Sequence, residues 1–557
     1  MEPTHATSTV VERLAAWICD VRYEDIPERV LEKARAQLVN VIASLHAGAR
    51  TDAGRAVLAV ARSRGGPAEH TVIPTGERLA MRDALLANAA FAMALDYDDY
   101  LYMGHTGHSA VLASLAIAER EGLSTRDMLV AIVVANEIGG RIGASCVLGP
   151  QNGQAWSFIH LAEGAAACAK LLGLTREQTA HALAIALYQP TFTLWPGFMG
   201  PTSKVLTAAV PTLTGIEAAE LAKAGLTGAL AIVEHPRKGF WASFTYVPLP
   251  AMMGGLGEAW VTDTLAFKRY PGCAYIDTTM DALFMALADA RQALGRPLEE
   301  GDVASVRVEA SLLTVEMDNL SSEHVNPHEP LSPVNVNFSI PYNVAIGILA
   351  GRHTGRELDQ GFLDRNDRAI RGLAAKTTLV HDWSMSALVV QAFGSLGRAS
   401  PIAALGPREL VRVIAGYRSQ MGGAKKSSLG VGRLLGADGV GLAGRIARAV
   451  KARARGPSSS DLGGADFSRF QMAFPARITL TTRTGACFRA RQDVPEGAPG
   501  QARYLEVVEE KLRTEAGEAL GEPGVACALS AMRSVEDVTV SELVAQACWG
   551  LATPPAR

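Results

Sequence analysis

The segment from Ala94 to Ser109 (ALDYDDYLYMGHTGHS) gathers the side chains of this chain that are best suited to proton chemistry. Three carboxylates, Asp96, Asp98 and Asp99, lie close together, and two histidines follow between glycines. Like charges at this spacing need a compensating cation or water. Apolar, helix-forming runs lie on both sides of the segment. We therefore expect a rigid site held between two packed helices.

Two other interpretations of this loop stay open. Asp and Gly are common turn residues, so a surface loop between helices could have the same composition. Carboxylate and imidazole groups also suit a divalent cation. The metal interpretation is the weaker one, because no helical His-x-x-x-His or Glu-x-x-His pattern accompanies the loop. We expect neither a metal nor another cofactor.

Length and composition limit the classes of protein to consider. A chain of 557 residues should form more than one domain, and a net charge of -3 gives no reason to expect nucleic acid or an anionic membrane as a partner. The seven cysteines are scattered without a Cys-x-x-Cys pair, which argues against structural zinc and iron–sulfur clusters. The start of the chain lacks the pattern of a signal peptide, and we find no run of about 18 apolar residues. We expect a soluble, cytoplasmic protein.

Hydrophobic periodicity predicts a mostly α, two-domain protein, with a large all-helical domain and a smaller α+β domain. Apolar residues recur at helical spacing from Val30 to Leu45, whereas Val306 and Val308, and later Ile478 and Leu480, alternate with polar residues as in strands. The predicted regions are a helical domain at 1–262, an α+β domain at 263–395 and 471–525, an inserted flexible segment at 396–470, and a tail at 526–557 that returns to the helical domain.

Four segments in the right order resemble the MmgE/PrpD family, which contains 2-methylcitrate dehydratases and cis-aconitate decarboxylases. They are LDYDD…GHTGHS, GLSTRDMLVAIVVANEIGGRI, GAAACAKLLGL and FKRYPGC. The resemblance covers nearly the whole chain except 396–470. It implies a helical domain joined to a smaller α+β domain, an active site in the cleft between them, a homodimer, and catalysis without a cofactor.

The resemblance also assigns site residues. The first acid of the family's loop falls on Asp96 and its loop histidine on His108. Two lysines of the family fall on Lys204, in GPTSKVLTAA, and on Lys268, in FKRYPGC. We expect these four side chains to meet in one pocket between the two domains.

Other positions depart from the family pattern, which suggests an unusual substrate. Tyr100 follows the paired acids, Asp277 replaces a histidine, and His324 aligns with a tyrosine of the decarboxylase branch. The histidine that many members carry before the Gly-Ala-Ala run is missing near 155–156, and His160 lies closer to that run.

Elimination of water from a β-hydroxy carboxylate needs a base, an acid and cations that hold the carboxylates. Histidine can exchange a proton near neutral pH, and buried ammonium groups stabilise charge that develops beside a carboxylate. The candidates for catalysis are Asp96, His108 and His160, and those for substrate binding are Lys204, Lys268, Tyr100 and His324. His160 and His324 are the candidates for a second proton transfer.

The sequence leads to three functional hypotheses. The first is a dehydratase of a hydroxy polycarboxylate of the 2-alkylcitrate kind, and the second is a decarboxylase or epimerase of a related acid in the same fold. The third is a non-catalytic binding protein that uses the 396–470 insertion as its surface. Convergence of Asp96, His108, Lys204 and Lys268 in one cleft would argue against the third hypothesis.

Overall fold

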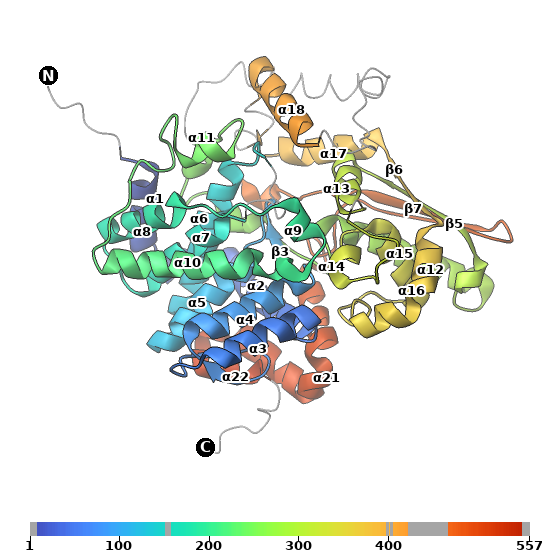
Figure 1. Cartoon of the computed structure of the whole chain (residues 1–557), viewed down its shortest axis with the longest axis horizontal. Helices are drawn as coiled ribbons and strands as arrows, with labels where there is room; N and C mark the ends of the chain where they lie inside the picture. The colour runs from blue at the N-terminus through green and yellow to red at the C-terminus, as the bar shows by residue number, and fades with distance from the viewer. Residues whose placement is uncertain are drawn as a thin grey trace.

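The protein is described here by a computed structural model that covers residues 8–150, 157–322, 324–396, 400–401, 405–421 and 466–548. Helices of the N-terminal half form one body, and a small sheet with its own helices forms a second body beside it (Figure 1). The prediction of a mostly helical, two-domain protein is therefore confirmed. The predicted flexible segment at 396–470 lies largely outside the described residues.

The helical domain is built on close contacts between small residues. At the crossing of helices α7 and α10, a Cβ atom on Gly164 would lie 2.5 Å from the carbonyl oxygen of Thr212, and one on Gly215 would lie 2.2 Å from that of Leu161. Only glycine fits at such distances. The helices of this domain are α1 (Val10–Asp20), α2 (Glu28–Ala49), α3 (Asp52–Arg64), α4 (Met81–Ala94), α5 (Gly107–Glu121), α6 (Thr125–Ser145), α7 (Ile159–Leu171), α8 (Arg176–Tyr188), α9 (Trp195–Met199), α10 (Leu206–Lys223) and α11 (Phe240–Phe244).

Two helical segments are long and apolar enough to cross a membrane by length and composition, Thr125–Ser145 and Thr202–Lys223. The apolar window of the first is entirely buried inside the protein, and that of the second is 67% buried. Both therefore behave as core helices of the helical domain, around which the other helices pack.

The α+β domain contains a four-stranded sheet in the order β6-β5-β7-β8, in which only the β5–β6 pair is parallel. Its strands are β5 (Val303–Ala310), β6 (Thr377–His381), β7 (Ala476–Thr482) and β8 (Cys487–Gln492). Buried and half-buried positions alternate along β7, as the alternation around Ile478 predicts. The helices are α12 (Ala274–Leu294), α13 (Leu312–Ser322), α14 (Pro333–Val336), α15 (Ile340–Ala350), α16 (Gln360–Ala374), α17 (Trp383–Gly394) and α18 (Pro407–Met421).

The C-terminal part returns to the helical domain earlier than the predicted residue 526. Helix α21 (Tyr504–Arg533), which is kinked at Gly521, already packs on α2, and α22 (Val540–Gln546) follows it (Figure 1). Two contacts fix this return: the Lys511 ammonium donates to Asn40, and the Arg50 guanidinium donates to the carbonyl oxygen of Glu515 at 2.7 Å. The sheet and α21 are thus parts of different domains.

Candidate active site

A short antiparallel pair brings the acidic loop beside the lysine that follows it far along the chain. Strand β3 (Asp99–Leu101) pairs with β4 (Leu265–Phe267), and Tyr100 lies opposite Ala266. The backbone N–H of Lys268 then donates to the carbonyl oxygen of Asp98 at 3.3 Å. Because β4 leads directly into α12, this pairing holds the helical domain against the first helix of the α+β domain.

Asp96 lies at the centre of the charged cluster. Its backbone has a φ of 52°, in the left-handed region that few residues other than glycine occupy. Its two carboxylate oxygens lie 3.5 Å from the Lys204 nitrogen and 3.1 Å from the Lys268 nitrogen. Burial raises the pKa of this carboxyl group, but the two ammonium groups outweigh burial and lower the pKa below its usual value.

Asp98 connects a lysine to two histidines. One oxygen lies 2.9 Å from the Lys268 nitrogen, and the other lies 3.0 Å from Nδ1 of His105 and 2.9 Å from Nε2 of His108. Burial again raises the pKa, while the charges of the histidines and of Lys268 hold the pKa of Asp98 well below its usual range. The group is therefore a fixed carboxylate that is hydrogen-bonded to the His105 ring and lies at ion-pair distance from the His108 ring.

The two predicted lysines differ in their hydrogen bonding. The Lys268 ammonium donates to the carbonyl oxygen of Asp96 and to both aspartates, and these charges raise its pKa although burial lowers it. Lys204, which precedes α10, makes no hydrogen bond of good geometry with the described part of the chain, and its nitrogen lies 4.0 Å from the ring centroid of Phe338. Burial lowers the pKa of Lys204 to about 8. Lys204 can therefore take a ligand anion, whereas Lys268 is already occupied.

A cavity of about 90 Å³ lies beside this cluster, between the two domains. Its polar wall includes Asp96, Tyr100 and His105, and the Tyr100 hydroxyl is buried without a hydrogen-bond partner among the described residues. The opposite walls are apolar and consist of Met103, Phe198, Leu313, Met317, Phe338 and Phe474.

The first turn of α12 completes the cavity. Cys273 stands at the N-cap of this 21-residue helix, and Cys273, Ala274 and Tyr275 line the cavity. Gly272 before it has a φ of 124°, and a Cβ atom there would lie 2.3 Å from the carbonyl oxygen of Asn337, so the approach needs glycine. The N-terminus of a long helix at the cavity wall favours a bound carboxylate.

His105, and not the predicted His108, faces the cavity. His105 lies in the turn after β3, where Leu101 and Gly104 exchange backbone hydrogen bonds at 2.7 and 2.9 Å, and it lines the cavity wall. His108 lies in the first turn of α5, is fully buried and is not among the cavity-lining residues. The sequence assignment missed His105. The signal that could have identified it is the start of a helix at Gly107, which places His108 on a packed helix and leaves His105 in the turn.

His160 lies one layer further from the cavity. Its Nδ1 is 2.7 Å from the Ser109 hydroxyl, which also contacts the carboxyl group of Glu163, and its ring centroid is 6.0 Å from that of His108. Burial and the charge of His108 lower the pKa of His160 well below its usual value, and burial raises that of Glu163 well above. Burial therefore favours the neutral form of both side chains.

The remaining predicted positions lie outside the cavity wall. The Asp277 carboxylate accepts hydrogen bonds from the backbone N–H groups of Arg269 and Tyr270 at 3.1 and 3.2 Å. It therefore fixes the backbone that follows Lys268. His324 follows α13 and is partly exposed, and only Leu313 and Met317 of that region line the cavity. The candidate position near 155–156 lies outside the described residues. Tyr100 is the departure that touches the cavity.

One group in the described part of the chain could offer three metal ligands, namely Asp98, His105 and His108. Their ligand atoms lie within 4.8 Å of one another. The Lys268 ammonium, however, already occupies one oxygen of Asp98 at 2.9 Å. A metal ion here would have to bind beside a fixed positive charge, which is unfavourable.

Comparisons with known proteins agree with this architecture. The MmgE/PrpD N-terminal domain matches residues 12–249, and the MmgE/PrpD C-terminal domain matches residues 270–393. The chain is 25% identical to the cis-aconitate decarboxylase of Aspergillus terreus over 62% of this chain and 73% of that protein. It is 26% identical to the cis-aconitate decarboxylase-like protein oryM of Aspergillus oryzae, over 47% of this chain and 58% of that protein. With both domains matched in order, the chain belongs to the MmgE/PrpD family.

Proposed function

We propose that this protein is a cofactor-independent lyase that acts on a small polycarboxylate. The observation that carries the proposal is that His105 and the first turn of α12 line one cavity between the domains, and that Lys204 lies just behind its wall. The Lys204 nitrogen is 3.5 Å from the Asp96 carboxylate and 4.0 Å from the ring centroid of Phe338, and both of these residues line the cavity. Lys204 and the helix N-terminus would hold a substrate carboxylate. His105, oriented through Nδ1 by Asp98, keeps Nε2 for a proton transfer beside that carboxylate.

Dehydration of a hydroxy polycarboxylate of the 2-alkylcitrate kind is the first candidate reaction. His105 would take the proton from the carbon next to the bound carboxylate, and a second group would donate a proton to the departing hydroxide. Tyr100 is suited to donate this proton, because it lines the cavity and its buried hydroxyl has no hydrogen-bond partner in the described part of the chain. Burial raises the pKa of Tyr100, so the hydroxyl is protonated before the reaction and can donate its proton to the departing hydroxide.

Decarboxylation is the second candidate, and two observations favour it. The curated relatives reported above are named as a cis-aconitate decarboxylase and a decarboxylase-like protein. Another part of the wall is formed by Leu313, Met317 and Phe474, and a carboxylate placed against these apolar side chains is destabilised relative to water. Loss of carbon dioxide removes that charge, and His105 would protonate the resulting carbanion. Epimerisation would use the same groups without a leaving group.

The deciding experiment incubates the purified protein with citrate, 2-methylcitrate, isocitrate and cis-aconitate. Formation of an unsaturated acid, followed by its ultraviolet absorbance, reports dehydration, and carbon dioxide release reports decarboxylation. His105→Asn serves as the control for adventitious activity. If no acid in the panel is converted although a polycarboxylate binds, the protein is a binding protein and the proposed function is wrong.

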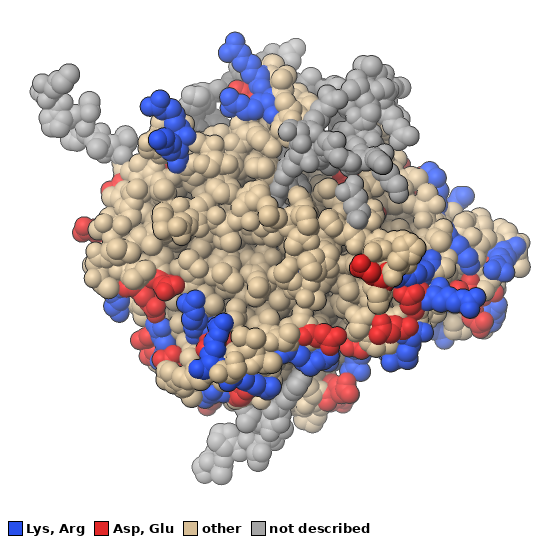
Figure 2. Space-filling view, viewed as in Figure 1, with Lys and Arg blue, Asp and Glu red and all other residues tan. Residues whose placement is uncertain are grey.

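A homodimer is part of the proposal. Large apolar side chains are exposed on α10 and on the segment before α9, and they include Tyr188, Phe192, Leu194, Leu206 and Val210. Figure 2 shows that the central face over these elements carries almost no Lys, Arg, Asp or Glu, whereas charges gather at the lower and right-hand edges. Such a face suits a second copy of the chain. Sedimentation of the protein and of Leu194→Glu tests this: the variant should be a monomer and the parent a dimer.

We also propose a cytoplasmic location, in keeping with seven free cysteines. Fractionation of cells that express the tagged protein tests the location.

A further inference from the structure

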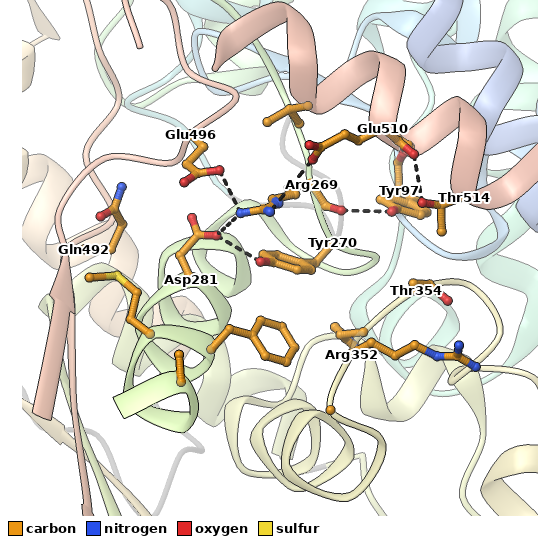
Figure 3. A pocket seen from close by; sticks show the side chains of 17 residues that line it. Tyr97, Arg269, Tyr270, Asp281, Arg352, Thr354, Gln492, Glu496, Glu510 and Thr514 are labelled. Atoms are coloured by element: carbon orange, nitrogen blue, oxygen red, sulfur yellow. Dashed lines mark hydrogen bonds and ion pairs between the residues drawn. The ribbon is translucent and has the colours of Figure 1, made fainter. Parts of the chain in front are cut away.

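A second cavity, of about 480 Å³, lies behind the two segments that carry the charged cluster. Tyr97, which stands between Asp96 and Asp98, and Arg269, which follows Lys268, both line it (Figure 3). The other walls come from α12, residues 351–354 and α21. The cavity itself favours no class of ligand, because its charged residues balance; they are Arg269, Arg352 and Lys511 against Asp281, Glu496 and Glu510.

Lys511, on α21, reaches the acidic loop at the floor of this cavity. Its ammonium donates to the side-chain oxygen of Asn40 at 2.8 Å and to the backbone carbonyl oxygen of Tyr97. The same nitrogen lies 3.9 Å from the centroid of the Tyr97 ring. The side chain is fully buried, so these contacts take the place of its hydration. A residue of the C-terminal helix thus holds the peptide group between the two aspartates.

Tyr97 also connects the acidic loop to the segment that carries Lys268. Its hydroxyl donates to the carbonyl oxygen of Arg269 at 2.9 Å, as the dashed line in Figure 3 shows. The loop that carries Asp96 and the segment that carries Lys268 are therefore joined twice, by the ion pairs on the active-site side and by Tyr97 on the other side. Ser44 of α2 also donates to the Tyr97 carbonyl oxygen, so both helices hold the same peptide group.

We propose that Lys511 is a positioning residue of the active site, which through Tyr97 fixes Asp96 and Asp98 against Lys268. This inference rests on the proposed function for its kinetic test, but its structural part can be measured without substrate. Lys511 does not line the active-site cavity, so any effect on rate must reach the substrate through the acidic loop.

The charge of Lys511 is sensitive to pH. Burial lowers the pKa of Lys511 to about 7. The groups that face it are Asp98 and Asp99 of the acidic loop and Glu515 of its own helix, which raise the pKa, and Lys268, which lowers it. An amine would donate more weakly to the Tyr97 carbonyl oxygen than an ammonium does. The loop should therefore be held best below pH 7.

The experiment compares Lys511→Met with a matched control, Lys170→Met. Lys170 lies on α7 and donates to the backbone carbonyl oxygens of Ile18 and Val21 at 2.9 and 2.6 Å, far from the charged cluster. We expect kcat of Lys511→Met to fall by about one to two orders of magnitude with a smaller change in KM, as for a misplaced catalytic group. Any decrease in kcat of the parent near pH 7 that comes from loss of the Lys511 charge should be absent from the pH profile of the variant. Lys170→Met should keep the parent kcat and lose only thermal stability.

A second readout needs no turnover. Cys273 lines the active-site cavity, and the rate at which iodoacetamide alkylates it can be followed by peptide mass spectrometry. A loosened loop should expose the thiol, so we expect faster alkylation in Lys511→Met and an unchanged rate in Lys170→Met. If the parent converts no acid, the proposed function is wrong, and this rate still tests the positioning role.

Parent-like kcat, pH profile and alkylation rate in Lys511→Met would overturn the proposal and leave Lys511 a structural residue. If Lys511→Met does not fold, Tyr97→Phe decides the question. It removes the hydroxyl that joins Arg269 and keeps the ring, so we expect a lower kcat and faster alkylation of Cys273 at a nearly unchanged melting temperature. Parent-like behaviour of Tyr97→Phe would overturn the proposal equally.

Discussion

Lys204 and Lys268 contact the two oxygens of one buried carboxylate, that of Asp96, at 3.5 and 3.1 Å. Lys268 also binds Asp98, whereas Lys204 rests against the Phe338 ring and keeps its hydrogen-bonding capacity. The two lysines therefore have different tasks. Lys268 stabilises the loop, and Lys204 is the cation left for a substrate.

Replacement of these two lysines by methionine should separate the tasks. Lys268→Met leaves the buried carboxylate of Asp98 without a lysine and that of Asp96 with Lys204 alone, and it should destabilise the fold by about 3–5 kcal/mol. Lys204→Met, a swap of similar volume, should cost less than about 1.5 kcal/mol but should raise KM strongly. Denaturant unfolding and steady-state kinetics measure both effects. Equal losses of stability would contradict this division of roles.

The acid–base state of Glu163 gives a prediction about pH and stability. Burial raises its pKa, so its folded pKa lies above the unfolded value of about 4.3. Below about pH 4 the carboxyl group is protonated in both the folded and the unfolded parent, so it does not reduce the stability. As pH rises toward the folded pKa, the unfolded state ionises first, and the parent loses up to about 1.4 kcal/mol of stability per pH unit. Glu163→Gln cannot ionise and should escape this loss.

Melting temperatures measured from pH 5 to pH 9 check this prediction. The difference between Glu163→Gln and the parent should grow in favour of the variant as pH rises. Ser109→Ala is the control, because it removes the hydroxyl that contacts Glu163 and keeps the ionisable group. Parallel curves for Glu163→Gln and the parent would show that the carboxyl group has no raised pKa.

Chelation tests the absence of a catalytic metal. The group of Asp98, His105 and His108 has the donor atoms for one, but Lys268 supplies a positive charge at the same carboxylate. We expect turnover to survive exhaustive dialysis against EDTA. Loss of activity that one divalent metal alone restores would assign that metal to these three side chains.

The sequence indicates the fold class and the acidic loop because local patterns encode both, whereas the resemblance to the family assigns Lys204 and Lys268. The helical periodicity, the strand alternation around Val308 and Ile478, and the crowded carboxylates are properties of neighbouring residues. The predicted return to the helical domain at residue 526 is later than the start of α21 at Tyr504. The return is revealed by contacts between distant residues, such as that of Lys511 with Asn40. No local pattern connects residues so far apart in the chain.

The direction of each side chain was beyond the sequence for the same reason. His105 and His108 differ in role because α5 starts at Gly107, so His108 packs inside while His105 stays in the turn. His324 is aligned by its neighbours in the sequence, whereas the end of α13 carries it away from the cavity wall.

The last prediction distinguishes the two histidines of the loop. Both contact the same oxygen of Asp98, at 3.0 Å from His105 and 2.9 Å from His108, but only His105 lines the cavity. His105→Asn should therefore lower kcat by about two to four orders of magnitude, the usual effect of losing a positioned acid–base group. His108→Asn should lower kcat much less and should act mainly on stability, because a fully buried ring is lost from the core. Steady-state kinetics and thermal unfolding of the two variants, measured side by side, check this. A His108→Asn variant that folds normally and is inactive, beside an active His105→Asn, would return the proton transfer to His108 and would require the loop to open during turnover.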